Sequence, residues 1–176
     1  RLKDAENQIT EYRYDEVGNR TREILPNGNT LVSVYDALNR LTSKSDDIGH
    51  LIREHRYDAD GNLVYTEDAN GNVTTYDYNA FNQRTFEHRP LGQTLEKRYD
   101  THGNLTHEID AEGQDITEHR YDVLNRLEKT TDPLLKERSV TYDQVGNQKT
   151  VTDWNGNTTT WEYDALNRVT SEEDAL

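Results

Sequence analysis

The chain has 176 residues, no cysteine and a formal net charge of −14. The absence of cysteine excludes a disulfide framework, a thiol catalyst and a cysteine-based zinc site, and the strong acidity argues against nucleic acid as a partner, because phosphate contacts need clustered Lys and Arg. Leu, Ile, Val and Phe supply only 34 of the 176 residues, which together with this charge ordinarily indicates disorder.

A recurring Tyr-Asp motif argues against disorder. Marking tyrosines recur 21 or 22 residues apart, and all ten glycines keep a fixed phase relative to them. We therefore predict a single repeat array over residues 1–176, with about eight repeats and with both ends truncated inside a repeat. The absence of Met and these truncated ends lead us to expect a piece of a longer polypeptide. The repeats begin at Tyr14, Tyr35, Tyr57, Tyr78, Tyr99, Tyr121, Tyr142 and Tyr163.

In chain order, residues 1–13 form the tail of a truncated repeat, and each later repeat contains two turn signals about ten residues apart. Asp or Pro early in the turn, with Gly or Asn at its fourth position, predicts a type I turn followed by a left-handed residue in a three-residue bulged loop. Leu135 replaces that residue in one repeat and should be strained. The residues expected at positive φ are Gly18, Gly28, Gly49, Gly61, Gly71, Gly92, Gly103, Gly113, Gly146, Gly156, Asn39, Asn82, Asn125 and Asn167.

Segments of about six residues, rich in Thr, Val, Ile and Tyr, separate the turns and match strands in length and composition. Short turns make successive strands antiparallel, so we predict an all-β meander of roughly sixteen strands, curled because strands twist. Each marking Tyr should lie across from the residue six positions later, for example Tyr57 from Leu63. The two 22-residue repeats predict bulges within His50–Arg56 and Gln114–Arg120.

The residues give no support for catalysis. No phosphate-binding, dinucleotide-binding or nucleophile-elbow motif occurs, and the histidines occupy tolerant surface positions, so we expect no enzyme activity, no metal site and no cofactor; calcium at the acidic turns is a weaker alternative. No apolar run is long enough to cross a bilayer, and no signal peptide is visible. Four aromatic residues are candidates for a glycan- or protein-binding patch: Tyr76, Phe86, Trp154 and Trp161.

Eight phased copies of the Tyr-Asp phrase, with Gly-Asn tips such as Gly61-Asn62, resemble the YD-repeat or Rhs family of bacterial polymorphic toxins, insecticidal toxin complexes and teneurins. The resemblance implies a spiral β-sheet shell, secreted or at the cell surface, that encloses a C-terminal toxin; the partners would then be the rest of the parent chain and that toxin. Asp132-Pro133-Leu134-Leu135 lacks the Gly of the family's autoproteolytic segment, so that role is not transferred.

Two functional hypotheses follow. The first is a non-catalytic wall segment of such a shell, and the alternative is an extracellular binding or adhesion module that recognises glycan or protein. The edge strands near Gln8–Arg13 and Arg168–Glu173 should also permit weak edge-to-edge self-association, opposed by like charge and favoured by added salt.

Overall fold

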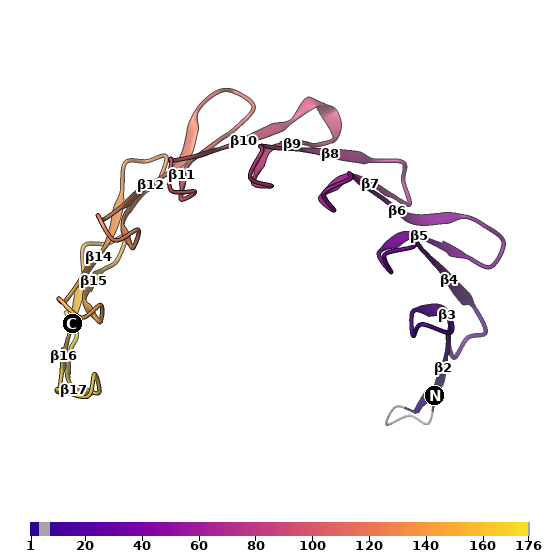
Figure 1. Ribbon diagram of the computed structural model, residues 1–176, viewed down its shortest axis with the longest axis horizontal. Coiled ribbons are helices and arrows are strands. Elements are labelled where there is room, and N and C mark those ends of the chain that lie inside the picture. The colour runs from indigo at the N-terminus through magenta and orange to yellow at the C-terminus, as the bar shows by residue number, and fades with distance from the viewer. Residues whose placement is uncertain (4–7, 176) are drawn as a thin grey trace. The chain divides into compact units, whose positions relative to one another are not determined.

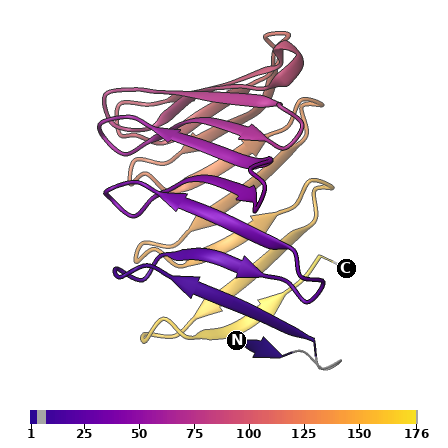
Figure 2. The same ribbon diagram turned by 90° about the vertical axis from the view of Figure 1, so that its right-hand side faces the viewer.

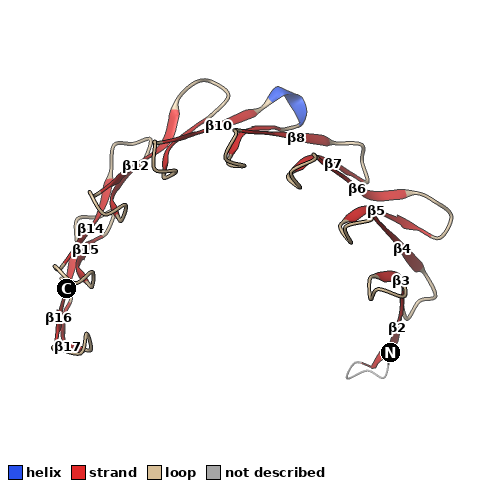
Figure 3. Cartoon of the chain, in the orientation of Figure 1, coloured by secondary structure: helices blue, strands red, loops and turns tan. Residues whose placement is uncertain are grey.

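The computed structural model describes residues 1–3 and 8–175, with the backbone alone described for Lys3, Asp115 and Ile116. These residues form strands and turns, apart from one short 3-10 turn at Pro90–Gly92 (Figure 3). The all-β prediction is confirmed. The chain divides into two compact units, Arg1–Gly92 and Gln93–Leu176, each with four of the marking tyrosines. That the two units belong to a single array stays a prediction.

In the first unit each strand pairs antiparallel with the next one in the chain. Figure 2 shows these hairpins, coloured indigo to magenta, following one another as the rungs of a single layer. The strands are β1 Leu2–Lys3, β2 Ile9–Tyr14, β3 Arg20–Ile24, β4 Thr30–Tyr35, β5 Leu41–Asp46, β6 Leu51–Tyr57, β7 Leu63–Asp68, β8 Val73–Tyr78 and β9 Arg84–His88.

The second unit repeats this meander with the same antiparallel pairing of successive strands. Figure 1 labels most of the strands along the chain. Those of the second unit are β10 Thr94–Tyr99, β11 Leu105–Ile109, β12 Asp115–Tyr121, β13 Leu127–Thr131, β14 Glu137–Tyr142, β15 Gln148–Thr152, β16 Thr158–Tyr163 and β17 Val169–Glu173.

Neither unit has a thick apolar core. Among the described residues only Ile109 and Val140 are buried hydrophobic side chains, with exposed fractions of 4% and 7%. A sheet covered on neither face cannot bury much apolar area, so burial contributes less per residue here than in a two-layered domain. Hydrogen bonds and ion pairs between hairpins must therefore carry much of the lateral cohesion.

The turns place every glycine, and the tip asparagines of four repeats, at positive φ. Gly61, for example, has a φ of 93° and Asn82 a φ of 59°. Leu135 adopts the same left-handed conformation (φ 61°), as expected, and its turn keeps the hydrogen bonds of the others. The turn at Arg89–Gly92 corrects the prediction, because Leu91 (φ 65°) joins Gly92 (φ 78°) in the left-handed region, so this turn is not a type I turn with one left-handed residue.

The predicted cross-strand register is confirmed at all eight marking tyrosines. Tyr57 faces Leu63 and Tyr121 faces Leu127, and the other six face the residue six positions later in the same way. The register then shifts by one residue beside each Tyr, a bulge that the sequence pattern did not predict. At four of these bulges a Thr hydroxyl donates to the carbonyl of the residue before the Tyr: Thr21, Thr42, Thr85 and Thr106.

The two extra residues of the 22-residue repeats are also bulges, as predicted. On β6, Glu54 and Arg53 face Ser43 and Lys44, but Leu51 faces Ser45, so Ile52 is the extra residue. On β12 the corresponding shift leaves Ile116 as the extra backbone position.

Candidate functional site

In the first turn of each repeat, the residue after the marking Tyr accepts hydrogen bonds from donors of the same turn. The turn at Asp58 is an example. The amide of Asp58 donates to the carbonyl of Asn62 (3.0 Å), and the amide of Gly61 donates to the carbonyl of Asp58 (3.2 Å). One carboxylate oxygen of Asp58 accepts the backbone N–H of Asn62 at 2.8 Å, and the other accepts its side-chain amide at 2.9 Å. Only a short acceptor side chain can reach these groups of its own turn.

These donors favour the charged carboxylate. The side-chain amide of Asn62, followed by backbone N–H groups, lowers the pKa of Asp58 below its ordinary value of 3.8. In the repeats with an Asn tip, the backbone N–H of Arg40 is the main cause that lowers the pKa of Asp36, and the guanidinium adds to it with its Nε 2.7 Å from the carboxylate. A charged Asp is thus part of the turn in both kinds of repeat.

The marking Tyr connects its own hairpin to the preceding one. The hydroxyl of Tyr57 donates to the backbone carbonyl of Leu41 at 3.0 Å, and that of Tyr121 donates to Leu105 at 3.0 Å. The acceptor is always the residue six positions after the preceding marking Tyr. We call this bond the tyrosine staple. It is also present from Tyr35 to Arg20, Tyr78 to Leu63, Tyr142 to Leu127 and Tyr163 to Gln148.

The staple lies where backbone pairing between successive repeats has stopped. Pairing of β5 with β6 ends at Ser43 and Glu54, three residues before Tyr57. Beyond this pair β5 and β6 are no longer in register, and the carbonyl of Leu41 accepts the hydroxyl of Tyr57; an unpaired carbonyl in a partly buried place would be unfavourable. The Tyr hydroxyl is a donor for this carbonyl, so the side chain extends the hydrogen bonding between the two hairpins beyond the last backbone pair.

A second contact between hairpins depends on which kind of turn comes first. Where a Gly-Asn tip precedes an Asn tip, the first Asn donates from its side-chain nitrogen to the side-chain oxygen of the second: Asn62 to Asn82 at 3.0 Å, for example. This Asn is the same residue that binds the Asp of its own turn. The other junctions of this kind are Asn19 to Asn39, Asn104 to Asn125 and Asn147 to Asn167.

At two junctions where an Asn tip precedes a Gly-Asn tip, an arginine makes the contact; Gln83 follows the third such tip, Asn82. The guanidinium of Arg40 lies 4.3 Å from the ring centroid of Tyr57, and Arg126 lies at the same distance from Tyr142. Such cation–π contacts contribute roughly 0.5–2 kcal/mol. A Cβ atom at Gly61 would lie 3.5 Å from Nη1 of Arg40, an ordinary van der Waals distance, so the arginine lies beside the glycine tip of the next hairpin. The kind of tip that comes first therefore determines the junction contact: an Asn pair after a Gly-Asn tip, and an Arg–Tyr contact after an Asn tip that is followed by Arg.

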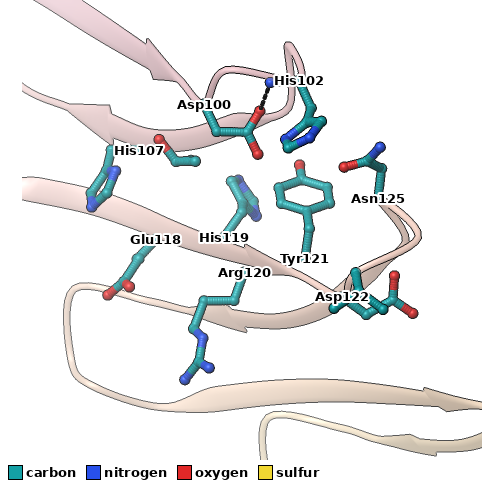
Figure 4. Close-up of a pocket in the computed structure, with 11 residues that line it drawn as sticks. Asp100, His102, His107, Glu118, His119, Arg120, Tyr121, Asp122 and Asn125 are labelled. Carbon is teal, nitrogen blue, oxygen red and sulfur yellow. Dashed lines mark hydrogen bonds between the residues drawn. The ribbon is translucent and has the colours of Figure 1, made fainter.

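In the second unit, the junction between the Tyr99 repeat and the Tyr121 repeat borders an open depression (Figure 4). The ring of Tyr121 points toward the turn of Asp100 and His102, where the carboxylate of Asp100 accepts the His102 N–H at 2.8 Å. His107 is paired with Glu118, so His119, the next residue, lies on the opposite face from His107. Among the described residues there is no group of three or more His, Asp or Glu side chains that could hold a metal ion.

Two of the candidate binding aromatics, Tyr76 and Phe86, lie on opposite faces of the sheet in the first unit. Phe86 is paired with Asp77, so Tyr76, the neighbour of Asp77, lies on the opposite face from Phe86. Phe86 stacks on His88 with 5.8 Å between ring centroids, whereas Tyr76 has the guanidinium of Arg84 over its ring.

In the second unit, Trp161 lines an open depression together with Tyr142 and Tyr163. Trp154 lies in a turn and is 39% exposed. No described helix is long and apolar enough to cross a membrane.

Sequence reasoning placed the tyrosines and the turns but missed the staple, the Asn pairs and the Arg contacts. A signal was present, because Arg follows the Asn tip at residues 40, 126 and 168 and Asn follows each tip Gly of the first turns. The phase of these residues indicated a shared role without indicating a partner.

A family model described as RHS Repeat matches residues 57–94, 99–134 and 142–176, more than half of the chain. The search of curated proteins found no match to this chain. The crystal structure of TcdB2-TccC3-Cdc42 is similar, with a TM-score of 0.70 and 20% identity over 91% of this chain and 10% of that chain. The Photorhabdus luminescens Tc holotoxin pore has a TM-score of 0.70 and 20% identity over 92% of this chain and 10% of that one. At this identity the likeness concerns the fold, and this chain spans about a tenth of each of those chains.

Proposed function

Because this chain belongs to the RHS repeat family, we propose that it is a non-catalytic structural scaffold, a wall segment of a hollow YD-repeat shell. The observation that carries the proposal is the tyrosine staple. Side chains from one end of the unit to the other join each hairpin to its neighbour, as between Tyr57 and Leu41, while the sheet remains one layer thick. A single-layered sheet of this kind can lengthen by the addition of repeats, because each repeat contacts only its neighbours, and it can form a thin wall.

We further propose that the two units form one array within a longer secreted or cell-surface polypeptide, and that the partners of the array are the rest of that polypeptide and an enclosed C-terminal toxin. Support comes from the resemblance of the repeats to those of polymorphic toxins and from the small share of the similar chains that this chain spans. Catalysis has no place in this function.

Limited proteolysis of the parent polypeptide tests containment. We expect a segment outside the repeats to resist protease until denaturant opens the wall, and Tyr57→Ala with Tyr121→Ala to expose it at a lower denaturant concentration. Tyr65→Ala is the matched control, because the hydroxyl of Tyr65 binds Glu67 of its own strand and joins no two hairpins. A parent without a protected segment, or protection that is equal in the wild type and the double variant, would overturn containment.

A second candidate, glycan binding, is favoured by one observation: the grouping of Trp161 with Tyr142 and Tyr163 around an open depression. Aromatic faces are suited to stacking on sugar rings. A glycan array with the wild type and Trp161→Ala tests it. Binding that the variant loses would support the module, whereas equal signals from both proteins would reject this depression as the site.

A further inference from the structure

Two histidines occupy the same place on the two strands that carry an extra residue. Both β6 and β12 end in Glu-His-Arg-Tyr, so that His55 and His119 lie two residues before a marking Tyr. Each faces a threonine of the next strand: His55 faces Thr66, and His119 faces Thr130. Each also lines an open depression against the first turn of the preceding hairpin. The two rings are therefore placed alike at the β5–β6 and β11–β12 junctions.

The hydrogen bonding of both rings suits a neutral imidazole. Nδ1 of His119 lies 3.2 Å from the hydroxyl oxygen of Thr130, which can donate to an unprotonated ring nitrogen. Nδ1 of His55 is buried and makes no hydrogen bond with a described residue. Adding a proton to a buried nitrogen without an acceptor costs free energy, because the charged ring loses its hydration. A proton on either ring is therefore unfavourable while the junction is closed.

Two positive side chains lie on the same face of the sheet as His55. Arg53 comes two residues earlier on β6, and Lys44 of β5 is paired with Arg53. On the other side, β7 places Asp68 opposite Arg53. The depression adds the ring of Tyr57 and the ion pair of Arg40 with Asp36. Burial, followed by the charge of Arg53, lowers the pKa of His55 below its ordinary value of 6.5.

Charges of both signs lie near His119, and burial is the largest influence on it. Burial lowers the pKa of His119 below 6.5, Glu108 raises it, and His107 and Lys97 lower it. Lys97 binds Glu108 at 2.8 Å, which offsets the charge of that carboxylate. The other titratable groups are Asp100, His102, Tyr121 and Asp122 at the depression (Figure 4), and Glu128 on β13 two residues from Thr130. The direction of the pKa change is thus the same as at His55.

We propose that protonation of His55 and His119 loosens the β5–β6 and β11–β12 junctions, so that each unit has one acid-sensitive position at which neighbouring hairpins separate first. A histidine whose pKa is lower in the closed junction than in the open one binds its proton more readily after opening. The stabilisation is complete above the ordinary value of 6.5 and is lost as the pH falls through the lower folded value. The turn carboxylates, such as Asp58 with its pKa below 3.8, keep their charge in this range.

Hydrogen exchange measured by mass spectrometry at about pH 7 and about pH 5, the range in which histidine changes charge, tests the proposal. Protection factors, which correct for the intrinsic pH dependence of exchange, should fall at the lower pH across β6 and β12. They should stay unchanged across β8, which has Tyr76 at the matching position. The double variant His55→Gln with His119→Gln is neutral at both pH values and should keep its protection. His55→Lys carries a positive charge throughout and should lose protection of β6 already at about pH 7.

His88→Gln is the matched control, because His88 also lies on a strand but has its Nε2 3.1 Å from the carboxylate of Asp77. This variant should keep the acid-induced loss of protection at β6 and β12. The proposal is overturned if the double glutamine variant loses as much protection as the wild type, if His88→Gln removes the loss, or if β8 loses protection to the same extent as β6. Acid sensitivity is a property of the junctions themselves, so it does not depend on the containment that the proteolysis experiment tests.

Discussion

The hydroxyl of Tyr57 donates a hydrogen bond of 3.0 Å to the backbone carbonyl of Leu41, a residue of the preceding hairpin. Tyr57 also faces Leu63 across its own hairpin. The aromatic ring therefore contacts its own hairpin while the hydroxyl binds the preceding one, which explains why Tyr rather than Phe marks the repeat. Phe would keep the cross-strand contact and leave the carbonyl of Leu41 without its donor.

Tyr57→Phe should lower the free energy of unfolding by about 1 kcal/mol, the usual net value of a hydrogen bond whose loss leaves a partly buried acceptor unpaired. Tyr14→Phe should change it by less than about 0.5 kcal/mol, as at most surface positions. Urea denaturation of both variants checks this. Equal losses would indicate that the ring environment, and not the staple, distinguishes Tyr from Phe.

Gly61→Val should destabilise the protein by roughly 1–2 kcal/mol, because a β-branched residue is strained at a φ of 93°. Gly61→Asn should cost clearly less, since Asn tolerates the left-handed region and occupies the same turn position at Asn82. Thermal unfolding compares the two variants. Matching shifts in Tm would show that the left-handed conformation at this tip is not required.

Leu135→Asn should stabilise the protein by about 0.5–1 kcal/mol, because it relieves left-handed strain at a leucine with φ 61°. The leucine side chain is 82% exposed, so little apolar contact is lost. Leu134→Asn is the matched control: Leu134 is a neighbouring exposed leucine without positive φ, and its replacement should not stabilise. Chemical denaturation decides, and a gain at both positions would point to a general effect of removing exposed leucine.

Stability should fall in acid as the turn carboxylates gain protons. The pKa of Asp58 is lowered in the folded state by the Asn62 side chain and by backbone donors, so the unfolded chain binds the proton more readily. The contribution is complete above the ordinary value of 3.8 and is lost as the pH falls through the lower folded value. Asp58→Asn should reduce the slope of stability against pH in this range. The variant should fold, because Asn79 accepts the same backbone bonds in its own turn.

Arg40→Gln and Tyr57→Leu should be coupled in a double-mutant cycle, because the guanidinium lies over the ring. We expect a coupling energy of roughly 0.5–1 kcal/mol. Arg40→Gln with Tyr142→Leu joins residues of different junctions and should show additive losses. The unfolding free energies of the four proteins in each cycle give the coupling energy. Additive losses in the first cycle would show that the cation–π contact does not contribute to stability.

Turn and register were predictable because their causes are local. A left-handed residue after a type I turn depends on four consecutive residues, and this loop length determines which residue faces Tyr57. The same local logic found the bulge at Ile52 from one extra residue. It failed at Leu91, where Pro90 and the flanking residues adopt a different turn from the one that the same signal indicates elsewhere.

The amino-acid sequence by itself determined the repeat, the turn positions, the strand order and the pairing within each hairpin, since these depend on residues a few positions apart. Only the tertiary structure decided what the phased Tyr, Asn and Arg side chains contact. Their partners lie fifteen to twenty-one residues away on another hairpin, and strand divergence beyond Ser43 and Glu54 exposes the carbonyl that Tyr57 binds. The hydroxyl and the carbonyl belong to successive repeats, so no single repeat contains both partners.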